Sequence, residues 1–322
     1  MKVVPKNYLS QARQRTDQSP IYITGPTGVG KSAFATLLSL QLGGEIIGAD
    51  AFQIYDGLPI LTAQPTSQEQ RGVPHHLIGT LPLKESCDAA DYSTMAQDAI
   101  KQVRKNHHIP IITGGTGLYI RSLISPLDKL PKADAILRAS FTELSTEALL
   151  ARLEALDPTA TTLIDCKNRR RVERALEIVI LSGSPLHEVW QKKKESLPIS
   201  CGFFLFRERE DLYQRIEVNV HKMFTQGVVE EIKVLDSLAV SPTASQALGF
   251  QEIRAYLRGE KSLETTIKKI SQLTKHYAKR QLTWFKNQHD FFPLNLSNFS
   301  SMEEALEHSS IVKLLRNEMK KS

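Results

Sequence analysis

The chain has 322 residues, of which 41% are hydrophobic and 24% charged, and its formal net charge is +6. These values are ordinary for a soluble globular protein and leave room for about two domains. An integral membrane protein is excluded, because no segment approaches the roughly 18 apolar residues that a transmembrane helix needs. The modest positive charge slightly favours a polyanionic partner.

The N-terminal residues and the cysteines bear on where the protein works. Residues 1–19 are polar and basic and lack the apolar stretch of a secretory signal. We expect a disordered N-terminal extension, with a weak organelle transit peptide as the alternative. The three cysteines, Cys87, Cys166 and Cys201, lie far apart without C-x-x-C spacing. This spacing predicts neither a disulfide framework nor a zinc site and is typical of a cytoplasmic protein.

Residues 20–120 have the pattern of an α/β domain, in which short apolar runs alternate with glycine-rich turns and an amphipathic segment. The expected strands cover 21–24, 45–50 and 109–113, and the expected helix covers 32–41, with Phe34, Leu37, Leu38 and Leu42 on its apolar face. Strand, glycine turn and helix in this order predict a parallel sheet wrapped by helices.

The pattern changes after residue 120. Residues 121–198 contain helical patterns at 149–156 and 171–181 with no strand-like run between them. We expect a small all-helical insertion domain that contacts the polyanionic partner. A strand at 201–206 returns the chain to the sheet, so that residues 199–290 complete the catalytic core. The rest of the chain has a helical pattern and ends in a polar C-terminal tail, residues 291–322.

The segment Gly25–Ser32 fits the pattern G-x-x-x-x-G-K-[ST] between a predicted strand and a predicted helix. Backbone amides in such a loop favour a bound anion, the lysine adds a positive charge, and the final hydroxyl binds a Mg²⁺ ion that bridges phosphates. The predicted phosphate-binding residues are Gly25, Pro26, Thr27, Gly28, Val29, Gly30, Lys31 and Ser32, with Mg²⁺ as the cofactor. The predicted fold class is α/β, a P-loop NTPase-like parallel sheet wrapped by helices, with a small all-helical insertion domain.

An acidic residue follows the strand at 45–50 and not the strand at 109–113, which ends in Thr-Gly-Gly-Thr. An ordinary ATPase has its magnesium-binding carboxylate on such a later strand. Asp50 is therefore the candidate general base on the acceptor side, and an aspartate that caps the following turn is the alternative. A phosphate loop with such a carboxylate fits phosphoryl transfer from ATP. It also fits attack on a carbon whose leaving group is a diphosphate, and the motif leaves both reactions open.

Further motifs resemble those of the tRNA dimethylallyltransferase (isopentenyltransferase) family and occur in the family's order. They are Gly25–Ser32, Glu45–Tyr55, Val73–Ile78, Gly114–Tyr119, Arg171–Glu177, Ala247–Glu252 and Thr274–Trp284. Each motif alone is weak, whereas the ordered set is specific. The resemblance implies transfer of a prenyl group from dimethylallyl diphosphate to the exocyclic amine of an adenine beside the tRNA anticodon. In that reaction the diphosphate is the leaving group.

The resemblance also implies roles for individual residues. Asp50 matches the base that removes the amine proton, Gln53 a residue that binds the flipped adenine, and Arg209 an arginine on the diphosphate. Thr116 matches a second position of the catalytic site. The positions that match tRNA contacts are Asp50, Ala51, Phe52, Gln53, Thr116, Arg138, Arg170, Arg171, Val172, Glu173 and Arg174.

Two basic helical segments are candidates for contact with tRNA phosphates. Arginines at 169–174 open a predicted helix, where cations oppose the helix dipole. In the segment 261–286, four lysines lie within about 40° of one another at 100° per residue, and they are Lys268, Lys275, Lys279 and Lys286. For this second segment, a solvated face above a core face is the simpler interpretation.

The sequence departs from the family pattern near the site. Residues 48–51 are Gly-Ala-Asp-Ala in place of Ser-x-Asp-Ser, and residues 61–65 are Leu-Thr-Ala-Gln-Pro in place of Gly-Thr-Ala-Lys-Pro. Gly79 replaces an aspartate and Asn219 an arginine. Because the predicted base, the loop lysine and the threonine are present, we expect an active enzyme. The changes bear on its rate, its handling of magnesium and its affinity for the prenyl donor.

Three alternatives remain open from the sequence. The first is prenylation of free adenine nucleotides, which needs neither the helical insertion nor the arginine cluster. The second is an ATP-dependent small-molecule kinase, and the third is an RNA-binding protein whose loop senses a nucleotide without turnover. For the leading interpretation we expect tRNA (its anticodon stem-loop) and dimethylallyl diphosphate as partners, no membrane association, and a cytoplasmic monomer.

Overall fold

The structure is a computed structural model that describes residues 19–125, 130–190, 201–235, 238–288 and 291–308. The expected N-terminal extension lies outside these residues except for Ser19. The chain forms two compact units. The core unit comprises residues 1–124 and 198–322, and the helical unit comprises residues 125–197.

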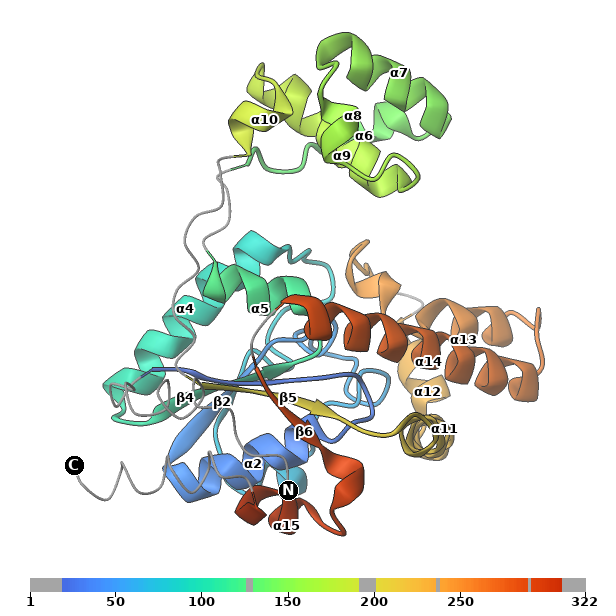
Figure 1. Cartoon of the computed structure of the whole chain (residues 1–322). Helices are drawn as coiled ribbons and strands as arrows, with labels where there is room; N and C mark the ends of the chain where they lie inside the picture. Colours follow the sequence, from blue (N-terminus) through green and yellow to red (C-terminus); the bar gives the residue numbers. More distant parts are fainter. Residues whose placement is uncertain (1–18, 126–129, 191–200, 236–237, 289–290, 309–322) are drawn as a thin grey trace. The chain divides into compact units, whose positions relative to one another are not determined.

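The core unit is built on a six-stranded sheet in the order β3-β2-β4-β1-β5-β6 (Figure 1). Each neighbouring pair of strands is parallel. The strands are β1 (Ile21–Thr24), β2 (Gly44–Gly48), β3 (His75–His76), β4 (Ile109–Gly114), β5 (Cys201–Phe206) and β6 (Phe292–Asn295). Strands β1, β2 and β4 are buried along their whole length, which explains why the sequence shows them as continuous apolar runs.

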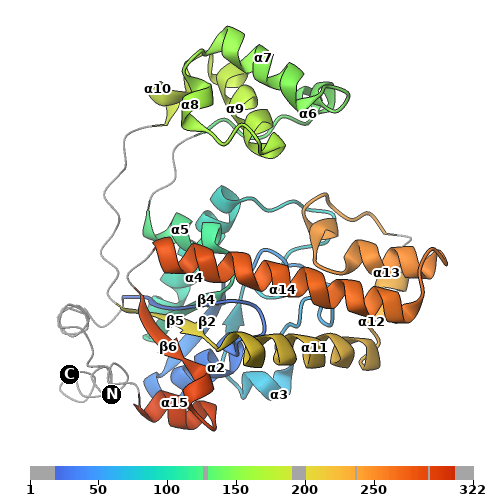
Figure 2. The same ribbon diagram turned by 45° about the vertical axis from the view of Figure 1, so that its right-hand side comes forward.

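Helices cover both faces of this sheet (Figures 1 and 2). One face carries α2 (Lys31–Leu42) and α15 (Met302–His308), and the other carries α4 (Ala89–Lys105) and α5 (Gly117–Ile124). The remaining helices of the unit are α3 (Ser67–Gln70), α11 (Arg209–Thr225), α12 (Val228–Val234), α13 (Phe250–Leu257) and α14 (Leu263–Gln288). Helix α14, with 26 residues, packs against α5, α11 and α13 and thereby joins the sheet to the outer helices.

The C-terminal residues correct the expected polar tail. Strand β6 pairs with β5 from Phe203↔Phe292 to Phe206↔Asn295 and forms the edge of the sheet. Helix α15 packs on α2 and buries Leu306 completely. The strand is short and contains Pro293, which an edge strand tolerates, so the local sequence has little strand signal. Residues 309–322 of the expected tail lie outside the described residues.

A close contact joins the ends of β2 and β4. Ala49 donates its amide to Thr113 O at 2.7 Å and accepts the Thr116 amide at 3.2 Å. A Cβ atom on Gly114 would lie 2.0 Å from Ala49 O, so only glycine fits there. The loops that follow these two strands are therefore held side by side.

The helical unit consists of α6 (Ala135–Phe141), α7 (Thr146–Leu156), α8 (Ala160–Leu163), α9 (Arg169–Ser182) and α10 (Leu186–Val189). Its core is apolar and includes Phe141, Leu149, Leu153, Val172, Leu176 and Leu186, each at most 1% exposed. Asp157 is buried within the unit and accepts the Leu186 amide at 2.7 Å. In the part of the chain that the structure describes, no helix combines the length and apolar character that crossing a bilayer requires.

Candidate active site

A cavity of about 1140 Å³ opens at the carboxyl ends of the central strands of the core unit. Parallel sheets bind ligands at this edge, where strands lead into loops and helix N-termini. The walls come from the glycine loop after β1, the residues that follow β2, helix α11 and the start of α15. The predicted site residues that line it are Thr27, Gly28, Gly30, Lys31, Ser32, Asp50 and Gln53.

The glycine loop has the backbone shape that its sequence predicts. Gly28 and Gly30 have φ values of 80° and 108°, in the region that favours glycine. Helix α2 begins at Lys31 without a side-chain cap, so the amides of its first turn are available to an anion. Gly25, Pro26 and Val29 do not line the cavity. They shape the loop instead, because Val29 is fully buried and Pro26 O accepts Lys31 Nζ at 2.9 Å.

Lys31 is the cation at the base of this loop. Burial lowers its pKa to about 8, and the Asp50 carboxylate opposes that change by favouring the charged ammonium. An anion bound at the loop would add further stabilisation of the ammonium. The loop thus provides an amide-lined anion site with a titratable cation.

Asp50 follows β2, caps the turn after it and also faces the cavity, as a general base would have to. Its Oδ1 accepts the amides of Phe52 at 3.0 Å and Gln53 at 3.4 Å, which caps the turn. The residue also lines the cavity together with Lys31. The turn therefore holds the carboxylate in a fixed orientation in which it can accept a proton.

Thr116 lies in the loop after β4 and supports the turn that carries Asp50. Its Oγ1 accepts the Ala51 amide at 2.9 Å, and Thr116 itself does not line the cavity. The Tyr277 hydroxyl of α14 lies near the Thr116 side chain, and burial together with the nearby Asp50 charge raises the pKa of that hydroxyl. Thr116 is thus placed to orient the base. Phe52 packs against the core and lies outside the lining as well.

Gln53 is held by the loop at residues 60–65, part of which departs from the family pattern. Its Nε2 donates to Thr62 O at 3.0 Å and to Ala63 O at 2.9 Å. That loop is fixed by Glu231 of α12, whose carboxylate accepts the amides of Ile60 at 2.7 Å and Leu61 at 2.8 Å. Glu231 lies 171 residues from Ile60, and no local pattern links the two.

The structure does not place Arg209 at the phosphate loop. Its guanidinium lies over the Tyr213 ring, 5.2 Å from the centroid, and does not line the cavity. Arg215, on the same helix, donates Nε to Gly28 O at 3.1 Å and does line it. Six residues at 100° each turn the helix by about 240°, so the two side chains lie on different faces. Arg215 therefore lies beside the loop, where the family resemblance implied Arg209.

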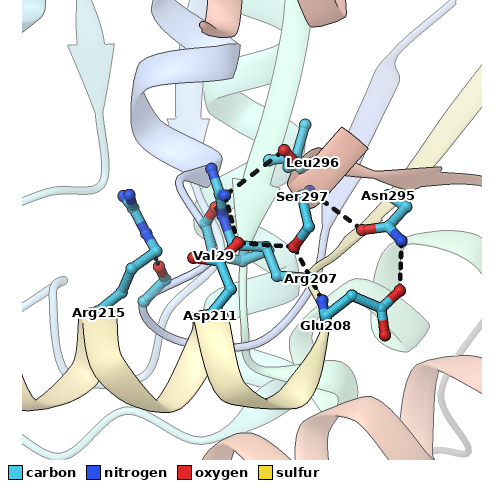
Figure 3. Close-up of polar contacts among 9 residues, drawn as sticks. Val29, Arg207, Glu208, Asp211, Arg215, Asn295, Leu296 and Ser297 are labelled. Atoms are coloured by element: carbon cyan, nitrogen blue, oxygen red, sulfur yellow. Dashed lines mark hydrogen bonds and ion pairs between the residues drawn. The ribbon is translucent and has the colours of Figure 1, made fainter. Parts of the chain in front are cut away.

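A second arginine ties the loop to the C-terminal residues (Figure 3). Arg207 Nε donates to Val29 O at 3.0 Å, and its Nη1 contacts Asp211 Oδ2 at 2.8 Å. The same carboxylate oxygen accepts the Ser297 hydroxyl at 2.6 Å. The segment after β6 thus supports the back of the phosphate loop.

Comparison with known proteins identifies the family. The family model described as IPP transferase matches residues 53–288, which is more than half of the chain. This chain belongs to the IPP transferase family. The tRNA dimethylallyltransferase of Akkermansia muciniphila is 40% identical over 268 residues, covering 83% of this chain and 90% of that protein. That of Anoxybacillus flavithermus is 39% identical over 272 residues, covering 83% and 87%.

Two solved structures are similar over nearly the whole chain. The full-length tRNA isopentenylpyrophosphate transferase from Bacillus halodurans has a TM-score of 0.68 and 33% identity, covering 95% of this chain and all of that one. A eukaryotic dimethylallyltransferase acting on tRNA has a TM-score of 0.79 and 27% identity, covering 91% and 78%. Together with the parallel sheet, these matches confirm the predicted α/β fold.

Two of the positions noted above as departures from the family pattern face the cavity. Gln64 and Asn219 line it. Gln64 donates to the backbone oxygens of Gln53 at 3.0 Å and Tyr55 at 2.8 Å, which fixes the residues after Asp50. A Cβ on Gly79 would lie 3.1 Å from Gln64 Oε1, so these two departures are neighbours.

Most of the basic residues predicted in the helical unit are engaged within it. Arg138 Nε and Nη2 donate to both carboxylate oxygens of the fully buried Glu177 at 2.9 Å, and Arg174 Nη1 contacts the same carboxylate at 2.5 Å. Burial raises the pKa of Glu177, but the bonds from Arg138 and Arg174 outweigh it and hold that pKa below its usual range. Glu173 pairs with Arg169 at 2.8 Å.

Val172 is fully buried in the core of the helical unit, which corrects the expectation of a tRNA-contacting side chain there. It lies on the apolar face of α9, whereas Arg170 and Arg171 are exposed on the same helix. The family motif spans a full helical turn, so some of its members necessarily face the core.

The lysine face of α14 is partly engaged as well. Lys275 forms an ion pair with Glu217 of α11 and lies 5.4 Å from the centroid of the Tyr213 ring. Lys268, Lys279 and Lys286 are exposed. Three of the four lysines are thus exposed, as a solvated face requires, and the fourth contacts α11.

The residues present fit a magnesium ion that is held mainly by its substrate. In the described part of the chain, no group of three His, Cys, Asp or Glu side chains could hold a metal ion. Ser32 lines the cavity at the start of α2, next to Lys31. Mg²⁺ in phosphate sites takes most of its ligands from phosphate oxygens and waters and only a few from the protein. The Ser32 hydroxyl can supply such a protein ligand.

Proposed function

We propose that this protein transfers the dimethylallyl group of dimethylallyl diphosphate to the exocyclic amine of the adenosine next to the anticodon of tRNA. The observation that carries this proposal is a single cavity lined by both the phosphate loop with Lys31 and the Asp50 carboxylate. A kinase would use the same two features. Membership of the IPP transferase family favours diphosphate as a leaving group over phosphoryl transfer.

The reaction needs one bond to form and one to break. The adenine amine nitrogen attacks the first carbon of the dimethylallyl group, and the bond from that carbon to the diphosphate oxygen breaks. The bonding electron pair leaves with the diphosphate, and Asp50 takes the amine proton. Lys31, Arg215 and the first-turn amides of α2 stabilise the charge that develops on the diphosphate.

Ser32 is the residue that would hold Mg²⁺ in this cavity. When bound, the ion neutralises part of the diphosphate charge as a Lewis acid. The target adenine must leave its stack to reach the cavity, at a cost of a few kcal/mol. Because Gln53 Nε2 is already held by two carbonyls, its Oε1 is the atom that would accept a hydrogen bond from the adenine. We further propose a monomer that acts in the cytoplasm.

Mass analysis of tRNA nucleosides tests the proposal. Unmodified tRNA is incubated with the protein, Mg²⁺ and dimethylallyl diphosphate, and parallel reactions contain ATP as donor or AMP as acceptor. We expect adenosine that is heavier by one five-carbon prenyl group, and only with tRNA and the prenyl donor. Prenylated AMP would instead support the free-nucleotide reaction, and a phosphorylated product would support a kinase.

We expect the affinity for dimethylallyl diphosphate to fall above pH 8. The free protein loses the Lys31 proton as the pH rises through about 8, whereas the bound diphosphate favours the charged ammonium. Binding then requires proton uptake, and the dissociation constant increases by up to about tenfold per pH unit. Titration calorimetry between pH 7 and 9.5 in two buffers of different ionisation enthalpy measures both effects. In Lys31→Arg the guanidinium stays charged, and a similar pH dependence there would contradict this assignment.

Arg171 and Arg174 should differ when each is replaced by alanine. Arg171→Ala should leave the melting temperature unchanged, because Arg171 is exposed. It should reduce the slope of log affinity for tRNA against log salt concentration by about 1, because an arginine of this kind neutralises one phosphate. Arg174→Ala should also destabilise the protein by about 1–3 kcal/mol, because it removes a partner from the buried Glu177. Thermal melts and salt-dependent tRNA binding distinguish the two variants. Equal melting temperatures for the two variants would show that the ion pair with Glu177 does not stabilise the protein.

A further inference from the structure

Gln281 of α14 connects two loops that lie far apart in the sequence. Its Oε1 accepts the Thr27 amide of the phosphate loop at 2.8 Å, and its Nε2 donates to Gly115 O in the loop after β4 at 2.8 Å. The side chain is 5% exposed. Both polar ends of one amide are therefore used, one on each loop.

The Gln281 amide lies directly against the backbone of the second loop. A Cβ on Gly115 would lie 2.3 Å from Gln281 Nε2, so glycine is required for the contact. A Cβ on Gly117 would lie 2.5 Å from the Trp284 ring, one turn further along α14. The helix thus lies directly against the backbone of the second loop.

The same helix reaches the acceptor side of the cavity. Tyr277, one turn before Gln281 on α14, lies close to the side chains of Thr116 and Gln281. Thr116 in turn accepts the Ala51 amide next to the predicted base. Gln281 therefore hydrogen-bonds the phosphate loop to Gly115, the residue directly before the threonine that supports the Asp50 turn.

We propose that Gln281 is a positioning residue that sets the spacing between the phosphate loop and the loop that orients the base. It does not line the cavity and is not expected to touch either substrate. Its role is to keep the leaving diphosphate and the attacking amine in line, for which displacement of about 1 Å costs on the order of a hundredfold in rate. This inference rests on the proposed prenyl transfer.

Two substitutions separate the two hydrogen bonds. Gln281→Met has a similar length and removes both bonds. Gln281→Glu keeps an acceptor for the Thr27 amide but places a carboxylate against Gly115 O, where it cannot donate. Gln272→Met, on an exposed part of α14, is the matched control for the substitution, and Ala278→Gly is a control that destabilises the same helix but keeps both hydrogen bonds of Gln281.

We expect both Gln281 variants to lower kcat by about ten- to a hundredfold. The directly measured dissociation constants for dimethylallyl diphosphate and tRNA should change less than about threefold, because the ligand contacts remain. Both controls should keep the kcat of the parent, measured well below their melting temperatures. A kcat within twofold of the parent in both folded Gln281 variants would overturn the proposal. So would an equal loss of kcat in Ala278→Gly.

A second readout does not depend on turnover. With Trp190→Phe as background, Trp284 is the remaining tryptophan, and its ring packs against Gly117 of the second loop. We expect inorganic pyrophosphate bound at the phosphate loop to change the Trp284 emission in this background but not after Gln281→Met. An identical change in both proteins would show that the loops communicate without Gln281 and would overturn the proposal. This result is independent of whether prenyl transfer is the reaction.

Discussion

Asp50→Asn is expected to lower kcat for tRNA prenylation by about 10²–10⁴-fold, the usual contribution of a positioned base. The substitution retains an Oδ1 atom that can accept the amides of Phe52 and Gln53, so the turn that carries the residue should persist. The substitution removes the capacity to take the amine proton and the electrostatic support that the carboxylate gives to the charged Lys31 ammonium. The affinity for tRNA and the melting temperature should therefore remain close to those of the parent.

Single-turnover kinetics with saturating tRNA and donor measures this effect without contributions from binding. Asp56→Asn is the matched control, because Asp56 is an exposed carboxylate six residues further along the chain. Its kcat should equal that of the parent. If Asp50→Asn retained more than about a tenth of the parental kcat, another group would have to be the base.

Lys31→Met should have the second large effect, a loss of about 10²–10³-fold in kcat/KM for dimethylallyl diphosphate. One preorganised group that stabilises developing charge contributes about this much. Affinity for tRNA alone should be nearly unchanged, because Lys31 lies at the base of the phosphate loop. Donor binding by calorimetry and steady-state kinetics at fixed tRNA test both statements.

The same substitution should stabilise the protein without ligands. The pKa of Lys31 falls from 10.5 to about 8 on folding, so the unfolded chain binds this proton more tightly than the folded chain. Below pH 8 the buried charge costs up to about 3 kcal/mol, and that cost disappears as the pH rises from about 8 to 10.5. Lys31→Met should therefore raise the melting temperature at pH 7, with Lys268→Met on the surface as control. A lower melting temperature would show that Lys31 is not destabilising.

The chemistry of the site and the central fold could be predicted from the sequence because their signals are local. The glycine loop needs a few residues in order, each with a fixed backbone or side-chain requirement, and buried parallel strands appear as short apolar runs. Asp50 follows directly from one such strand. The ordered motifs then indicated the family, which the comparisons confirmed.

Contacts between distant segments were decided only by the tertiary structure. Gln281 and Thr27 are 254 residues apart, and Glu231 and Ile60 are 171 apart, so no local period links them. Arg215 rather than Arg209 faces the phosphate loop because the packing of α11 sets its rotation, which the sequence of a polar helix specifies weakly. The edge strand β6 likewise depends on pairing with β5, since its own four residues carry too little pattern to define a strand. The sequence thus predicted Lys31 and Asp50 as candidate catalytic groups, and packing determined which residues lie beside them and hold them in place.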